Sequence, residues 1–137
     1  MRDLATFDQR VHAIHGANAP LLAHFQTWLA QSGVTEKTMK NHMDNITFFA
    51  EYLVYYDNPL KRLDEADGSD VSLFLSDWFP RKALWANETN MRAYFASFKK
   101  FFRWMETAGY CPSEIVTEIL TTLKEDRDLF LDAVAHF

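Results

Sequence analysis

The chain has 137 residues, of which 48% are hydrophobic and 15% aromatic, and its 19 acidic and 14 basic residues give a formal net charge of −5. This composition excludes a disordered tail, and the single cysteine, Cys111, excludes an internal disulfide and a zinc site built from several cysteines. Since no apolar run reaches the roughly 18 residues of a membrane span and the N-terminus lacks the features of a secretory signal, we expect a cytoplasmic protein without a membrane partner.

The first half of the chain carries three helical patterns. A weaker one covers residues 3–14. A stronger helix is predicted from Pro20 to Gln31, because proline is tolerated in a first helical turn and Gly33 follows as a stop. The next helix is predicted to begin at Thr35, an N-cap residue, and to reach Tyr56 before "DNP". Its apolar residues recur at steps of three and four, as on one buried face: Met39, Met43, Ile46, Phe49, Ala50 and Leu53.

The second half predicts three more helices. Ser69 is expected to cap a short helix that Pro80 closes, and Asn87 to cap a long helix that Gly109 ends. A final helical segment opens with Pro112, and "KEDRD" interrupts its apolar pattern, so it is either one helix or two. Strand alternation is absent from the sequence. It therefore predicts an all-α fold, a compact bundle of four to five helices with a C-terminal helical extension.

Three parts are predicted along the chain. Residues 1–19 form an N-terminal segment with some helical character, residues 20–112 form the main helical domain, and residues 113–137 form an acidic amphipathic C-terminal helix.

The helix predicted after Asn87 contains "FASFKKFFRWMETAG", which is both highly aromatic and basic. On a helical wheel at about 100° per residue, the basic residues Arg92, Lys99 and Arg103 share a stripe about 16 Å long, with Thr89 just beyond it and Lys100 further round. The apolar residues occupy a separate face: Met91, Tyr94, Phe95, Phe98, Phe101, Phe102 and Met105.

Charge is segregated along the chain. Residues 81–104 contain six basic residues and one acidic residue, whereas residues 57–78 and 105–137 are both net acidic. A basic stripe on a well-anchored helix suits contact with phosphates. The alternative is that the stripe is the ordinary polar face of an amphipathic helix.

Three segments resemble a known family when they are taken in order. They are "FQTWLAQSGVTEKTMKNHMDNITFFAEYL", "LDEADGSDVSLFL" and "ETNMRAYFASFKKFFRWMETAGYCP". Together they resemble the core-binding domain of tyrosine recombinases, the phage-integrase family, which is a SAM-like helical bundle. The features that carry the resemblance are Trp28–Leu29, Gly33, Thr38 with Phe49, Asp70–Leu75, and Phe101–Phe102–Arg103–Trp104 with Gly109.

The resemblance implies binding of double-stranded DNA through two helix faces. The corresponding positions are Lys37, Thr38, Lys40 and Asn41, after Thr35 on the helix before Tyr56, together with Thr89, Arg92, Lys99, Lys100 and Arg103 on the helix after Asn87. Phosphate contacts are expected to dominate, with any base readout coming from Lys37, Lys40, Asn41 or Arg92.

The chain departs from the recombinase pattern in its catalytic parts. None of its histidines begins a His-x-x-Arg motif, and too few residues follow Gly109 for a catalytic domain. Cys111–Pro112 stands where the family often has Asn-Pro, and the tail is acidic rather than a basic linker. These departures predict a non-catalytic DNA-binding module, derived from or truncated from a recombinase, that needs no cofactor.

Other chemistry finds little support in the sequence. The histidines lack metal-ligand spacing with carboxylates, so no metal site is predicted. Cys111 has no histidine near it in sequence, which favours a structural role over a nucleophilic one. A glycine-rich phosphate loop and a Gly-x-Ser-x-Gly motif are both absent. The sequence therefore predicts that the protein is not an enzyme.

The acidic tail leaves a second hypothesis open. It either completes the bundle or docks on a second copy or a recombinase partner through Leu129, Phe130, Val134 and Phe137. In the docking case the protein is a helical interaction or oligomerisation module that has lost DNA binding. The charge of the tail could also shield the basic stripe.

Overall fold

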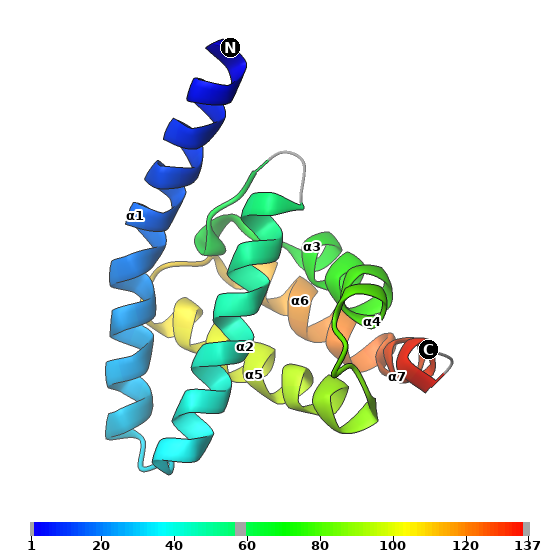
Figure 1. Cartoon of the computed structure of the whole chain (residues 1–137). Helices are drawn as coiled ribbons and strands as arrows, with labels where there is room; N and C mark the ends of the chain where they lie inside the picture. Colours follow the sequence, from blue (N-terminus) through cyan, green and yellow to red (C-terminus); the bar gives the residue numbers. More distant parts are fainter. Residues whose placement is uncertain (1, 57–59, 136–137) are drawn as a thin grey trace. The chain divides into compact units, whose positions relative to one another are not determined.

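The structure is a computed structural model that describes residues 2–56 and 60–135, with side chains described from residue 6 onward. Within these ranges every regular element is helical, and the all-α prediction is confirmed. The chain divides into two compact units, residues 1–65 and residues 66–137. This division differs from the boundaries predicted after residues 19 and 112. Figure 1 shows the course of the helices within each unit.

The first unit is built on two long helices, α1 (Arg2–Gln31) and α2 (Glu36–Tyr55), which lie side by side and are joined at Gly33 (Figure 1). Gly33 has a φ of 84°, a left-handed conformation that favours glycine. The prediction of two separate helices before Gly33 is wrong, because α1 is continuous and Pro20 lies inside it. A proline inside a helix costs about 3 kcal/mol. Burial of Leu21, Phe25 and Leu29 in the following turns offsets that cost.

The start of α2 follows the sequence prediction. Thr35 is the N-cap, and its hydroxyl oxygen accepts a hydrogen bond from the backbone N–H of Thr38 at 3.1 Å. The predicted inner face is buried at Ile46, Phe49 and Leu53, each with no exposed surface. The "DNP" segment that was predicted to end this helix, residues 57–59, lies outside the described residues.

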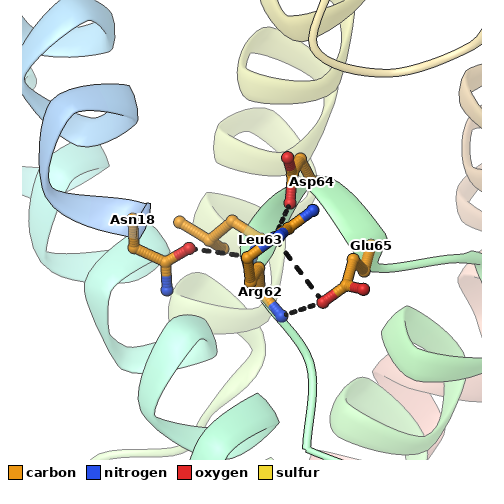
Figure 2. Close-up of polar contacts among 5 residues, drawn as sticks. All are labelled: Asn18, Arg62, Leu63, Asp64 and Glu65. Atoms are coloured by element: carbon orange, nitrogen blue, oxygen red, sulfur yellow. Dashed lines mark hydrogen bonds and ion pairs between the residues drawn. The ribbon is translucent and has the colours of Figure 1, made fainter. Parts of the chain in front are cut away.

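A polar tether attaches the segment after α2 to α1 (Figure 2). Asn18 is buried, and its side-chain oxygen accepts a hydrogen bond from the backbone N–H of Leu63, at 3.0 Å, in the short helix η1 (Leu63–Glu65). Arg62 donates to Asp64 at 2.9 Å, and this bond is the main reason that the pKa of Arg62 lies above its ordinary value. Because Leu63 is fully buried, Asn18 satisfies a backbone group that would otherwise be costly to bury.

The second unit begins with three short helices that follow one another directly: α3 (Gly68–Leu73), the π-helix η2 (Phe74–Trp78) and α4 (Phe79–Lys82). The N-cap of α3 is Asp67, not Ser69 as predicted. Asp67 and Asp70 form a reciprocal capping box with hydrogen bonds of 3.1 and 3.0 Å. The prediction that Pro80 closes this region is also wrong. Pro80 stands at the start of α4, where a missing N–H is tolerated.

The long helix α5 (Glu88–Thr107) is the centre of the second unit. The side chain of Asn87 caps it by accepting from the N–H of Asn90 at 2.8 Å, and Gly109 follows its end with a φ of 85°, as predicted. Each residue of the predicted apolar face is buried: Met91, Tyr94, Phe95, Phe98, Phe101, Phe102 and Met105. Two helices pack against α5: α6 (Ser113–Glu125) and α7 (Arg127–Ala135). A break at Asp126 separates them, so the final segment forms two helices.

An aromatic cluster forms much of the core of the second unit. The ring centroids of Phe79 and Tyr94 lie 4.7 Å apart, and those of Phe74 and Tyr94 lie 5.4 Å apart. Phe98 adds edge-on contact with Phe74. Pairs of this kind contribute roughly 0.5–1.5 kcal/mol beyond the burial of their area. The packing fixes the rotation of α5 and therefore the direction in which its basic residues project.

Candidate phosphate-binding site

The basic and hydroxyl residues at the start of α2 are exposed and interact with their sequence neighbours. Thr38 uses its backbone N–H and its hydroxyl with the capping residue Thr35, and the two hydroxyl oxygens lie 3.0 Å apart. Lys40 forms an ion pair with Asp44, four residues later, at 2.7 Å. Lys37 and Asn41 are exposed beside them. Of the two lysines, one is therefore already neutralised within the helix.

The first turns of α5 show the same local pairing. The guanidinium of Arg92 donates to Glu88 Oε1 from Nε at 3.1 Å and from Nη2 at 2.7 Å. Thr89 is exposed nearby, and Lys100 is half-buried further along the helix. Within the described part of the chain, Lys99 and Arg103 have no carboxylate at ion-pair distance. The basic stripe predicted from the sequence is therefore divided, with Arg92 occupied and the pair Lys99 and Arg103 available.

Lys99 and Arg103 line an open pocket of about 380 Å³ within the second unit. The remaining lining residues come from α6 and the start of α7. They are Thr117, Leu120, Thr121, Leu123, Lys124 and Arg127. On α6, Thr117, Thr121 and Lys124 are spaced at i, i+4 and i+7, so they share one helix face. We call these eight lining residues the basic pocket, since four of them carry positive charge.

Arg127 is held in place by the core of the unit. Its guanidinium carbon lies 5.1 Å from the ring centroid of Phe95, within the range of a cation–π interaction. The Phe95 ring in turn contacts Phe130 of α7, with centroids 6.1 Å apart. Arg127 keeps its charge in this contact, because the ring attracts the cation without accepting a proton. The positive charge is therefore fixed in position and still available to an anion.

The C-terminal segment is acidic as a whole, but the charged side chains that it contributes to the pocket are all positive. Two of the pocket's four cations, Lys124 and Arg127, come from the "KEDRD" segment of that tail. Among the residues that the structure describes, none of the four forms an ion pair, and no carboxylate lines the pocket. The tail therefore contributes positive charge to this site. Four unpaired cations and two hydroxyls around one cavity form an environment in which a phosphate is strongly favoured.

Two of the four cations of this pocket were predicted from the sequence. Of the nine predicted DNA-contacting residues, Lys99 and Arg103 line it. Thr89, Arg92 and Lys100 lie on the same helix but do not line the pocket, and Lys37, Thr38, Lys40 and Asn41 belong to the first unit. The threonines and cations of α6 and α7 were missed. The spacing of Thr117, Thr121 and Lys124 on one helix face was the signal that could have indicated them.

The single cysteine, Cys111, is buried. The described side chains include no group of three histidine, cysteine or carboxylate residues placed to hold a metal ion. Among the helices described, none combines the length and the apolar character that crossing a bilayer requires.

Comparison with known proteins gives no match to a protein-family model, to a curated protein or to a solved structure.

Proposed function

We propose that the protein is a non-catalytic module that binds double-stranded DNA through phosphate contacts made mainly by the basic pocket. One observation carries the proposal. Lys99, Arg103, Lys124 and Arg127 converge on one cavity, and no ion pair with any described residue neutralises them. A duplex presents phosphates at close intervals, and cations that replace its condensed counterions gain affinity as those ions are released. The resemblance to recombinase core-binding domains supports the same proposal, because it assigns a DNA-facing role to α5, the helix that carries Lys99 and Arg103.

The net charge of −5 does not oppose this proposal at short range. Charges separated by more than the Debye length, about 8–10 Å at physiological salt, are largely screened. A phosphate inside the pocket therefore interacts chiefly with the lining residues and with the carboxylates close to them in sequence, none of which lines the pocket: Glu106, Glu125, Asp126 and Asp128. Remote carboxylates lower the rate of encounter more than they weaken the bound state.

The residues at the start of α2 have a secondary role in this proposal. Lys37 and Asn41 are exposed and are available for additional contacts. Lys40 contributes less, because binding DNA would require it to leave or share Asp44.

The alternative, a protein-interaction module acting through the C-terminal helix, has less support. Phe130 and Val134 are buried within the protein, and of the four apolar residues considered for docking, Leu129 is the exposed one among those described. Phe137 lies outside the described residues. A single exposed leucine is common on soluble proteins and does not form a docking face.

The test is a titration of labelled mixed-sequence duplex DNA followed by fluorescence anisotropy at several salt concentrations. We expect the wild-type protein to bind. In the triple variant Lys99→Gln, Arg103→Gln and Lys124→Gln, we expect affinity to fall on the order of 100-fold and the log–log salt slope to flatten by about three units. These side chains are exposed or half-buried, so the variant should keep its fold, which circular dichroism would check.

A matched control removes the same charge from the same unit. Arg81→Gln, Lys82→Gln and Arg92→Gln together also delete three positive charges, but none of these residues lines the basic pocket. Arg81 is bound to Asp77 and Arg92 to Glu88. We expect this variant to bind DNA within about threefold of the wild type, because Arg81 and Arg92 are exposed charges already paired with carboxylates and Lys82 lies outside the pocket. Equal losses in the two variants would show that only net charge matters and would refute the assigned site.

A further inference from the structure

The basic pocket is larger and less polar than a phosphate group alone requires. Its volume of about 380 Å³ lies within the range of sites for small organic ligands, roughly 300–1,000 Å³. Leu123, which is almost fully buried, and Leu120, which is half-buried, contribute an apolar part to the lining. A phosphate alone would leave this apolar surface in contact with water. The pocket therefore has room for an organic group attached to the phosphate.

The lining offers three kinds of interaction at once. The cations attract an anion, the hydroxyls of Thr117 and Thr121 donate and accept hydrogen bonds, and Leu120 offers a surface to a flat or aliphatic group. Leu120 and Thr121 are adjacent in α6 and both line the pocket, so an apolar and a polar contact are available side by side. A nucleotide combines a phosphate, a hydroxyl-bearing sugar and a base with apolar faces, and it matches all three.

We infer that the basic pocket binds one nucleoside phosphate unit, with the phosphate on the cations and the sugar or base against Leu120. The unit is either a free nucleotide or an unpaired nucleotide at the end of a DNA strand. The second case deepens the proposed function and rests on it. Attraction to the cations alone would bind inorganic phosphate as well as a nucleotide, whereas contact with Leu120 favours the nucleotide.

The first arm of the test measures binding of small molecules to the full chain by isothermal titration calorimetry. The probes are deoxyadenosine 5′-monophosphate, inorganic phosphate and deoxyadenosine. We expect the nucleotide to bind about tenfold more tightly than phosphate, since partial burial of an organic group adds to the affinity of the charged group. Deoxyadenosine, which lacks the charge, should bind more weakly than either.

Two substitutions separate the contributions within the pocket. Leu120→Ala should weaken nucleotide binding about fivefold and leave phosphate binding unchanged. Thr121→Val, which removes the hydroxyl and keeps the shape, should weaken both ligands about three- to tenfold. Because both side chains are partly or fully exposed, thermal melting should show folded variants.

The second arm asks whether the nucleotide belongs to a DNA strand. A blunt duplex is compared with the same duplex carrying a single-nucleotide 5′-phosphorylated overhang. Tighter binding of the overhang duplex, with displacement of the mononucleotide, supports the strand end. Mononucleotide binding without any overhang preference supports a free nucleotide as the ligand.

The failures of the two proposals are distinguishable. The nucleotide site is overturned if inorganic phosphate binds as tightly as the mononucleotide and Leu120→Ala changes neither, even when blunt duplex binds well. The proposed function is overturned if neither duplex binds at low salt, whatever the mononucleotide does.

Discussion

The start of α2 and the basic pocket contain the same kinds of side chain in different arrangements. At the start of α2, the hydroxyls of Thr35 and Thr38 serve the helix cap, and Lys40 is paired with Asp44. These partners lie within four residues of one another. In the basic pocket, the cations and threonines come from three helices and converge on one cavity, with no ion pair among the described residues.

The difference shows that charge composition alone does not identify a binding surface. The field of a cation is largely cancelled by a carboxylate four residues away on the same helix. Lys40 and Arg92 are both in this position. A cation without a carboxylate at that spacing retains more of its field. Lys99 and Arg103 are themselves four residues apart, and this repulsive spacing is tolerated because the aromatic face of α5 anchors the helix.

The largest effect that would test this contrast is the removal of the aromatic support beneath the pocket. Phe95→Ala should lower the free energy of unfolding by about 3–5 kcal/mol, because it leaves a cavity in the core and removes the contacts with Phe130 and Arg127. Chemical denaturation would measure it. The matched control is Leu84→Ala, since Leu84 is fully exposed in the same unit and should change stability by less than about 0.5 kcal/mol.

A smaller effect is expected from the cap of α2. Thr35→Ala should lower the free energy of unfolding by about 1 kcal/mol, because the N–H of Thr38 loses its acceptor. DNA affinity should stay within about twofold, since this hydroxyl is committed to the helix. Thermal melting and anisotropy on the same samples would check both values. A large loss of DNA affinity with little change in melting would instead place Thr35 in the interface.

The smallest predicted effect concerns the ion pair between Arg92 and Glu88. Glu88→Gln frees Arg92 from its ion pair, and we expect DNA affinity to rise about two- to threefold, the size of an exposed pair. Glu51→Gln is the control, because Glu51 is exposed on α2, has no basic residue within four positions and forms no ion pair within the described residues. Equal gains in the two variants, measured by anisotropy, would show that the released arginine contributes nothing.

The sequence predicted those parts of the fold that local rules determine. The caps Thr35 and Asn87 and the buried face of α5 follow from spacing and from backbone hydrogen-bonding needs. Pro20 was misjudged because tertiary burial of the next turns outweighed a local preference. Asp67 caps α3 in place of Ser69, because Asp67 and Asp70 satisfy each other's backbone N–H groups.

Only part of the candidate site could be predicted from the sequence. Lys99 and Arg103 could be found, since a helical wheel places them on one stripe. The spacing of Thr117, Thr121 and Lys124 indicates a shared face of α6 but not that this face meets α5, and Arg127 stands among acidic residues. Only the break at Asp126 and the packing of α6 and α7 on α5 place Lys124 and Arg127 with the first pair. Convergence of this kind depends on tertiary structure, which local patterns do not encode.

The number of residues at the junction between α6 and α7 is constrained by the side chains on either side of it. Leu123 and Phe130 must both reach the interior, while Lys124 and Arg127 between them must both face the cavity. Adding or deleting one residue at Asp126 would rotate everything after it by about 100° about the axis of α7. Arg127 and Phe130 both follow Asp126, so both side chains would be misdirected. Variation in length should therefore be tolerated far less at this junction than substitution of its exposed side chains.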